Sequence, residues 1–444
     1  MKLASLFKKL SSFQIMILGF MSLILVGALL LMTPIASRGM HWTSFENSLF
    51  TATSAVCVTG LVVRDTATYW STFGQAVILI LIQIGGLGII TITAFFAAVS
   101  GRKITLFQRH LLQDSLSSHQ IGGVVRLMGF IFRLVFIIEM AGALLMMPVF
   151  CMHFGWHGVW MAFFHSVSAF CNAGFDIMGS YSGRFSSLTA FADNYFIVIP
   201  ICLLIISGGL GFLTWDDFVV HKFRFKRYRM QSKVILVTSL LLIVIPALLL
   251  FINDYASYPL HRRIALSLFQ AVTPRTAGFN TADLTQLTLS GRTLFVFLML
   301  IGGSPGSTAG GMKTTTIAVL FGNAVSVMRR KKNTQFFGRR IDDSTVKNAA
   351  TLLVMYVFLM IAGALVISMI DDVPGSYSIF ETASAVGTVG LTLGITPSLS
   401  LVSHLILIVL MFIGRVGGLT LLYAAMNKTG AEVSQYPVEK ISVG

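Results

Sequence analysis

The stretch Thr388-Val389-Gly390-Leu391 lies between a short, mildly amphipathic segment, residues 377–386, and a long apolar run. The same layout occurs three more times along the chain. The other tetrapeptides, each with the short segment before it, are Val58-Thr59-Gly60-Leu61 after 44–56, Asn172-Ala173-Gly174-Phe175 after 159–170, and Thr276-Ala277-Gly278-Phe279 after 264–273. One glycine after a short helix is a common helix cap, but four in the same context indicate a shared role.

Ion dehydration explains why a chain would repeat such a glycine. An ion that crosses a membrane exchanges its water shell for other oxygens, which the backbone carbonyls of converging strands can supply. Glycine accepts the unusual backbone angles that such strands need and allows their close approach. We therefore predict a K+ selectivity filter whose residues are Val58, Thr59, Gly60, Asn172, Ala173, Gly174, Thr276, Ala277, Gly278, Thr388, Val389 and Gly390. Ordinary tight turns are the alternative, although irregular backbone at membrane depth must be buried or line water.

The composition is that of a membrane protein. Of 444 residues, 55% are hydrophobic and 11% are charged, and the mean hydropathy is +0.83. The net charge of +15 is carried by short loops between apolar runs, so it indicates membrane topology and not a nucleic-acid partner. The four cysteines form no CxxC pair, so neither a disulfide framework nor a structural metal is expected. The basic N-terminus before an apolar run has no small-residue cleavage site, which favours a retained first helix over a signal peptide.

The apolar runs and short segments divide the chain into four units. The four glycines are 114, 104 and 112 residues apart, far more than in solenoid repeats. Each unit holds two spans, M1 and M2, around one short re-entrant helix, P. The predicted segments are an N-terminal tail (1–12), repeat 1 (13–100), a loop (101–121), repeat 2 (122–217), a loop (218–233), repeat 3 (234–328), a loop (329–347), repeat 4 (348–426) and a C-terminal tail (427–444).

The loop charges predict the orientation. Lys and Arg concentrate in the three loops that join the units, which marks these loops and both termini as cytoplasmic. Two crossings per unit give all four units the same orientation, so they can surround one axis. The predicted fold is an all-α polytopic membrane protein with four tandem M1–P–M2 repeats, eight transmembrane helices and four re-entrant pore helices, around one pseudo-fourfold pore.

A glycine-rich break interrupts the second span of the third unit. We expect the break and two nearby cations to form a gate, with the residues Gly302, Gly303, Ser304, Pro305, Gly306, Ser307, Thr308, Ala309, Gly310, Gly311, Met312, Lys313 and Arg415. The break is no phosphate loop, because Met312 separates Gly311 from Lys313. A movable plug is favoured over a proline kink, because the break holds more glycines and hydroxyls than a kink needs.

Several polar residues leave two interpretations open. Arg415 lies deep in the last span, where it either faces the axis near the plug or forms an ion pair with a distant carboxylate such as Glu139. Asp65, Asp176 and Asp283 follow three of the glycines, where they either gather cations at the outer mouth or are solvated loop residues. Arg275 precedes the third strand, and its side chain is expected to point away from the pore.

These residues together resemble the superfamily of K+ transporters that includes TrkH, KtrB and their plant and fungal relatives. The family has four joined M1–P–M2 units, one glycine per filter strand, a gating loop in the third M2 and an arginine in the fourth. The matching features are the four glycines, the loop 302–312, Arg415 and the stretch Thr-Pro-Arg-Thr-Ala-Gly-Phe at 273–279. Only about a dozen residues precede the first span, which favours the Ktr-type branch over Trk-type members with extra N-terminal spans.

The resemblance implies further properties that composition does not carry. It implies K+ uptake that Na+ stimulates, a location in the bacterial plasma membrane, a homodimer in the lipid bilayer, and a cytoplasmic RCK-type (KtrA-like) regulatory ring. No cofactor is expected in this chain, so any nucleotide would act through that ring.

The expected function is K+ translocation without enzymatic activity. Two rival interpretations remain open at this point. One is a secondary active cation symporter with alternating access, in which the third-unit break is the substrate site. The other is the ion path of a pump whose separate ATPase subunit drives transport.

Overall fold

The computed structural model describes residues 11–100, 109, 112, 113, 123–418, 420 and 439. Most of the predicted N-terminal tail, most of the loop 101–121 and nearly all of the C-terminal tail 427–444 therefore lie outside the described residues. The described part is predominantly helical, with one antiparallel hairpin formed by β1 (Gln335–Phe336) and β2 (Arg339–Arg340).

Long apolar helices make this chain a multi-pass membrane protein. Among the described residues, four helices are long and apolar enough to cross a bilayer: α2 (Ser12–Met32), α7 (Val124–Phe154), α12 (Met230–Ile252) and α16 (Asp343–Asp371). The 21 residues of α2 extend about 30 Å, the thickness of the hydrocarbon core. Two bent pairs raise the number of candidate spans to as many as six: α4 (Thr72–Leu87) with α5 (Ile89–Val99), and α10 (Tyr195–Gly209) with α11 (Phe212–His221).

Four short helices form the centre of the molecule. They are α3 (Phe45–Val56), α8 (His157–Phe170), α13 (Leu260–Val272) and α17 (Gly375–Gly387). The last residues of each are buried, whereas only 22 to 33% of the most apolar window of each long helix is buried. The long helices therefore present most of their surface to lipid, and the short helices make the interior.

Each of the apolar helices that follow the four short helices begins at a capping side chain. The hydroxyls of Ser71, Thr288 and Ser400 accept hydrogen bonds from backbone N–H groups in the first turns of α4, α14 and α18, and the Asn194 side chain does so for α10. The remaining elements are α14 (Leu289–Leu300), α15 (Thr314–Met328), α18 (Leu401–Val416), the short α9 (Gly179–Ser182) and the 3₁₀ turns η1 (Pro34–Ala36), η2 (Thr189–Phe191), η3 (Phe225–Arg227), η4 (Leu284–Gln286) and η5 (Thr396–Ser398).

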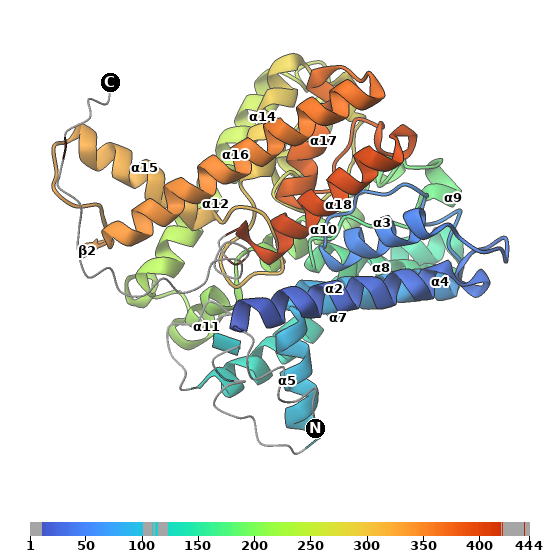
Figure 1. Cartoon of the computed structure of the whole chain (residues 1–444), viewed down its shortest axis with the longest axis horizontal. Coiled ribbons are helices and arrows are strands. Elements are labelled where there is room, and N and C mark those ends of the chain that lie inside the picture. Colours follow the sequence, from blue (N-terminus) through green and yellow to red (C-terminus); the bar gives the residue numbers. More distant parts are fainter. Residues whose placement is uncertain are drawn as a thin grey trace.

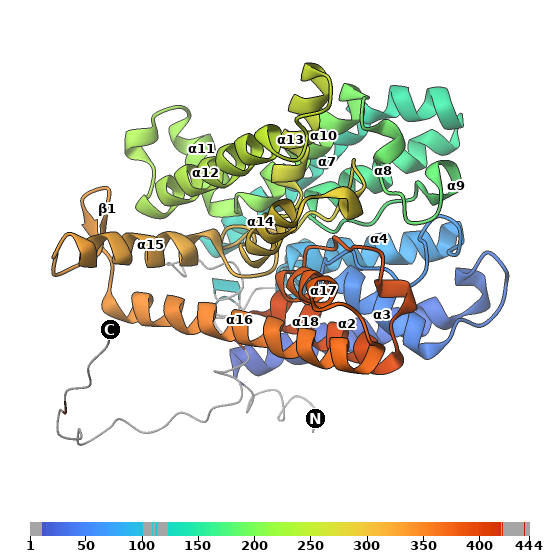
Figure 2. The same cartoon turned by 90° about the horizontal axis from the view of Figure 1, so that it is seen from above.

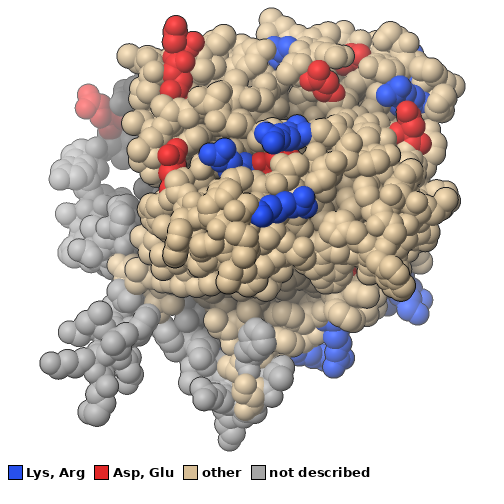
Figure 3. Space-filling model, turned by 90° about the vertical axis from the view of Figure 1, so that its right-hand side faces the viewer, with Lys and Arg blue, Asp and Glu red and all other residues tan. Residues whose placement is uncertain are grey.

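The two described basic connections lie at the same end of the molecule. The α11–α12 connection and the β1–β2 hairpin lie opposite α9, as both views show (Figures 1 and 2). The rings of Phe225 and Phe337 meet between them, with centroids 6.2 Å apart. The opposite end, which carries α9, shows a largely uncharged surface with charges of both signs, and several basic side chains lie close together near its middle (Figure 3).

The helices extend beyond the predicted apolar runs. Helix α12 begins at Met230 and α16 at Asp343, where the sequence predicted repeats beginning at 234 and 348. Lys233 and Lys347, which the sequence placed in loops, are therefore helical. Long basic side chains allow this, because their backbone can stay helical while the charged end reaches the membrane interface.

Candidate functional site

Four chain reversals follow the four central helices. In each, a residue two positions before the glycine has positive φ, and the glycine itself has φ between +67° and +91°. The residues in this left-handed conformation are Val58, Asn172, Thr276 and Thr388. We call the stretches 58–60, 172–174, 276–278 and 388–390 glycine segments 1 to 4.

The four glycine segments close into a ring. A Cβ atom built on each glycine would lie within 2.8 Å of the carbonyl oxygen that precedes the glycine of the next segment. The contacts run from Gly60 to Ala173, from Gly174 to Ala277, from Gly278 to Val389 and from Gly390 to Thr59. Only glycine fits at these four positions, because any side chain would collide with the neighbouring backbone.

Segments 1 and 4 are held by a serine that accepts a hydrogen bond. The Gly60 N–H donates to Ser54 Oγ at 3.0 Å, and the Gly390 N–H donates to Ser384 Oγ at 3.0 Å. Each serine lies six residues before its glycine, so the two segments share one local geometry.

Segments 2 and 3 are held by a hydroxyl that donates. Ser168 Oγ donates to the Phe175 carbonyl at 2.7 Å, and Thr273 Oγ1 donates to the Phe279 carbonyl. The third turn is one residue shorter than the others, because the Ala277 N–H bonds four residues back whereas the Ala173 N–H bonds five residues back.

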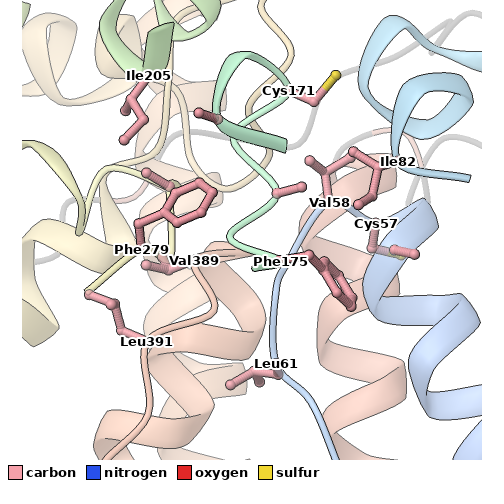
Figure 4. Close-up of a cluster of buried hydrophobic side chains, with 14 of the residues drawn as sticks. Cys57, Val58, Leu61, Ile82, Cys171, Phe175, Ile205, Phe279, Val389 and Leu391 are labelled. Atoms are coloured by element: carbon pink, nitrogen blue, oxygen red, sulfur yellow. The ribbon is translucent and has the colours of Figure 1, made fainter. Parts of the chain in front are cut away.

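Apolar side chains pack behind the segments. Figure 4 shows Val58 beside Ile82 and Cys57, and Val389 near Phe279. Val58, Phe279 and Val389 are completely buried. This packing supports the ring from outside and leaves the backbone to face its centre.

A cavity of about 130 Å³ lies against the ring on one side. It is lined by all four ring glycines together with Asp176, Phe185, Ser187, Asn280 and Thr392. Its walls come from the loops that precede the second helix of each unit. We call it the outer cavity, because the loop charges predict that these loops face away from the cytoplasm.

The three candidate aspartates have three different environments. Asp65 is buried and accepts hydrogen bonds from the Thr68 and Phe185 N–H groups, at 2.8 and 2.9 Å. Asp176 lines the outer cavity. Asp283 is on a loop, where the Thr285 hydroxyl lowers the pKa of its carboxyl. Only Asp176 of the three is placed to meet an ion at the ring.

The 302–312 loop is attached to unit 2 by neutral hydrogen bonds. The Ser304 N–H donates to the Gly209 carbonyl at 2.9 Å, and Thr308 Oγ1 donates to the Phe170 and Gly208 carbonyls at 3.0 and 3.1 Å. The loop thereby touches both the end of α8 and the bend between α10 and α11.

On its other side, the same loop is attached by Arg415. Its guanidinium donates to the carbonyls of Thr308, Gly85 and Gly86, the last at 2.9 Å. The suggested ion pair with Glu139 is wrong, because Glu139 accepts from Gln83 Nε2 at 3.2 Å instead. Arg415, bonded to three carbonyls, bridges unit 4, unit 1 and the loop.

The second cation of the candidate gate binds the loop itself. Lys313 Nζ donates to the Ala309 carbonyl at 2.8 Å. Lys313 and Arg415 both line a cavity of about 230 Å³ near the start of α2 and the bend after α4. We call it the inner cavity, and it holds positive charge where the outer cavity holds Asp176.

Glycines let the second helices bend and pack closely against the C-terminal ends of the central helices. The α4–α5 and α10–α11 pairs bend by 95° and 97° at Gly88 and Gly211, which have φ of +85° and +86°. Nearby, Gly85 and Gly208 pack against the final carbonyls of α3 and α8, at Val56 and Phe170, and Gly414 packs against the carbonyl of Val386, one residue before the end of α17. These contacts bring the helix C-termini, with their partial negative charge, close to the ring.

Arg275 is directed away from the ring. It is buried, and its Nη2 donates to Ser239 Oγ of α12 at 3.2 Å. Gln83, Ser54 and Ser384 also support the site, and sequence reasoning missed them. The serines had a signal, since Ser54, Ser168 and Ser384 occupy the same position before their glycines.

Comparisons with known proteins agree with this arrangement. A family model described as TrkH, a cation transport protein, matches residues 7–434. The potassium/sodium uptake protein NtpJ of Enterococcus hirae is 40% identical over 449 residues, covering 98% of each chain. The Ktr system potassium uptake protein B of Bacillus subtilis is 37% identical, covering 97% of this chain and 96% of the relative.

A solved structure has the same fold. The crystal structure of the potassium transporter TrkH from Vibrio parahaemolyticus superimposes with a TM-score of 0.73 and covers 93% of this chain and 84% of its own. The two sequences are 20% identical, so this likeness concerns the fold alone.

Proposed function

Because the chain belongs to the TrkH family of cation transport proteins, we propose that it carries potassium ions across the membrane through the ring of four glycine segments. The observation that supports this most is the closed ring, in which each glycine meets the carbonyl before the next glycine. Backbone carbonyls around one axis replace the water shell of an ion.

The proposed architecture is four M1–P–M2 repeats with eight spans. The repeats are α2, α3 and α4–α5; α7, α8 and α10–α11; α12, α13 and α14–α15; and α16, α17 and α18. The four P helices end at the ring, and α14 and α15 are the two halves of a span that the 302–312 loop interrupts. This grouping assigns one glycine segment to each repeat.

The proposed filter comprises residues 58–60, 172–174, 276–278 and 388–390. Their carbonyls supply the ion ligands, and the C-terminal ends of the P helices favour a cation. Side chains add little, because those of Val58, Val389 and Ala277 are buried.

The proposed gate is the 302–312 loop with Lys313 and Arg415. The loop crosses beneath the ring. It is bonded to unit 2 on one side and, through Arg415 and the Gly311 N–H, to units 1 and 4 on the other. Release of either attachment would let it swing away from the axis. The guanidinium also places a positive charge that opposes cation passage while the loop is closed.

The basic connections at the end opposite α9 support a cytoplasmic assignment for that end. We place the protein in the bacterial plasma membrane with both termini in the cytoplasm. A homodimer, stimulation by Na+ and control by a cytoplasmic nucleotide-binding ring complete the proposal, and the family resemblance supports them.

The test is ion flux into liposomes that contain the purified chain, with wild type beside Gly278→Ser. The mutation should lower the ratio of K+ to Na+ flux by about tenfold, equivalent to roughly 1.4 kcal/mol of differential ion binding. The control is Gly338→Ser, because Gly338 has φ of +76° against +79° for Gly278 but has open space around it.

The outcomes separate the proposal from its rivals. An unchanged ratio in folded Gly278→Ser would contradict the filter. Flux that saturates and vanishes without a second ion would indicate a symporter, and dependence on a copurifying ATPase would indicate a pump subunit. If the wild-type chain alone is silent, flux that appears on adding the regulatory ring would support the proposed control.

A further inference from the structure

A buried carboxylate holds the chain that leaves glycine segment 4. Glu381 of α17 is completely buried, and its two oxygens accept hydrogen bonds from two threonines. Thr392 Oγ1 donates to Oε2 at 2.9 Å, and Thr396 Oγ1 donates to Oε1. The two threonines thus engage different oxygens of the carboxyl group. We call the chain between Gly390 and α18 the exit loop. Glu381 attaches two residues of this loop, Thr392 and Thr396, to α17.

The same network reaches the surface through α18. His404 Nε2 lies 2.8 Å from the Thr396 carbonyl, and His404 Nδ1 lies 2.7 Å from Glu46 Oε1. The Glu46 side chain is 34% exposed. The exit loop is thus held on two sides, by α17 through Glu381 and by α18 through His404.

The other central helices carry different residues at the corresponding position. It lies nine residues before the glycine in units 1, 2 and 4 and eight before it in unit 3, where the turn is shorter. The residues are Thr51, His165, Gln270 and Glu381.

Three of these four residues reach the chain beyond their glycine. Gln270 Nε2 donates to Asn280 Oδ1 at 2.9 Å, and His165 Nε2 accepts from the Ile177 N–H at 3.4 Å. The Thr51 hydroxyl instead donates to the Asn47 carbonyl of its own helix, at 2.8 Å. Glu381 makes the largest number of these attachments, because its two carboxyl oxygens each accept from a different threonine.

Thr392 connects the carboxylate to the ion path. It lies two residues after Gly390 and lines the outer cavity together with the ring glycines. Peptide planes are rigid, so a displacement of Thr392 is passed to the φ and ψ angles of Gly390 and Leu391. Gly390 has no Cβ to resist such a rotation, so its carbonyl needs an anchor elsewhere.

We propose that Glu381 is a positioning residue for ion selectivity, which fixes the exit of glycine segment 4 through its hydrogen bond with Thr392. The inference rests on the proposed function of the ring. On this inference, the chain after glycine segment 4 is held in place by Glu381. The chain after glycine segment 1 has no corresponding hydrogen bond from Thr51, whose hydroxyl bonds its own helix.

The test compares Glu381→Leu, Glu381→Gln and Thr392→Val with a matched control, Thr51→Val, in liposomes that hold the whole chain. The readout is the ratio of K+ to Na+ flux, because a change in the amount of folded protein scales both fluxes and leaves their ratio unchanged. Glu381→Leu and Thr392→Val should each lower the ratio by at least about threefold. Glu381→Gln should lower it less, and Thr51→Val should leave it unchanged.

The double variant Glu381→Leu/Thr392→Val sharpens the result. If both residues act through one hydrogen bond, it should lower the ratio no further than Glu381→Leu alone. If Glu381→Leu fails to fold, Thr392→Val decides the matter, because it removes one hydroxyl at nearly constant volume. A selective wild type with an unchanged ratio in Thr392→Val would overturn the inference alone, whereas a non-selective wild type would overturn the proposed function and the inference together.

Discussion

Glycine segments 1 and 4 differ from segments 2 and 3 in the direction of one hydrogen bond. In segments 1 and 4, Ser54 and Ser384 accept from the glycine N–H. In segments 2 and 3, Ser168 and Thr273 donate to the carbonyl after the glycine. Segments 1 and 4 are therefore held at the glycine itself, whereas segments 2 and 3 are held at the residue after the glycine.

The difference shows what tandem repeats allow. Four identical subunits would have to hold every segment in the same way, whereas joined repeats can vary each one separately. What all four share is the glycine, since each must fit against a neighbouring carbonyl.

The 302–312 loop follows the same division. Its attachments to unit 2 are neutral hydrogen bonds, among them those from Ser304 and Thr308. Its attachments to units 4 and 1 combine the charged Arg415 with one neutral hydrogen bond, from the Gly311 N–H to the Gly414 carbonyl at 3.0 Å. The two halves of the ring thus have different links to the loop, and variants can separate them.

The largest effect is expected from Gly390→Ala. Its Cβ would collide with the Thr59 carbonyl, so the ratio of K+ to Na+ flux should fall to about one. Gly123→Ala is the control, because Gly123 has a similar φ of +89° with nothing within 4 Å of a Cβ. Equal loss of selectivity in both variants would show that backbone strain, and not the closed ring, decides the effect.

A smaller effect is expected from Arg415→Ala, which should raise the total K+ flux and not change the ratio of K+ to Na+ flux. Loss of its charge-assisted hydrogen bonds leaves that side of the loop held by the Gly311–Gly414 hydrogen bond alone, so K+ flux should rise by about tenfold at unchanged selectivity. Lys313→Ala separates the two roles of Arg415, because it removes a positive charge from the same cavity while Lys313 bonds, among the described residues, only to carbonyls of the loop itself. A smaller rise in flux is therefore expected for Lys313→Ala than for Arg415→Ala. Reduced flux in a folded Arg415→Ala protein would contradict the gate.

The smallest effect tests the comparison of the segments directly. Ser384→Ala leaves the buried Gly390 N–H without its acceptor and should lower the K+ to Na+ ratio by about threefold. Ser168→Ala removes a donor from the Phe175 carbonyl, and a buried carbonyl tolerates a missing partner better than an N–H group does. Flux ratios from the two variants, measured side by side, should therefore differ, and equal ratios would show that the hydrogen-bond direction has no consequence.

Sequence reasoning predicted the membrane class and the family, and the comparisons confirm both. Apolar runs near the length of a span and short segments before glycines were sufficient, because membrane thickness and backbone conformation are local constraints. The 95° and 97° bends were not predicted, although the Gly-Gly-Leu-Gly stretches at 85–88 and 208–211 mark their positions. A glycine permits a bend, but neighbouring helices decide its angle.

The hydrogen-bond partners of Arg415 and Glu139 could not be predicted from the sequence. The sequence suggested Glu139 for Arg415, but the structure pairs Glu139 with Gln83 and Arg415 with carbonyls. A carbonyl is present at every residue, so no sequence pattern singles out the ones that an arginine meets.

The sequence by itself determined where the backbone must reverse, since only glycine combines positive φ with the absence of a side chain at Gly60, Gly174, Gly278 and Gly390. The sequence also determined at which end of each span the Lys- and Arg-rich loops lie. The tertiary structure alone decided that the four reversals close into one ring, that Arg415 bonds the loop, and that Glu381 meets Thr392. These contacts join residues whose approach depends on how the helices pack, and packing reflects the shapes of all the surrounding side chains together.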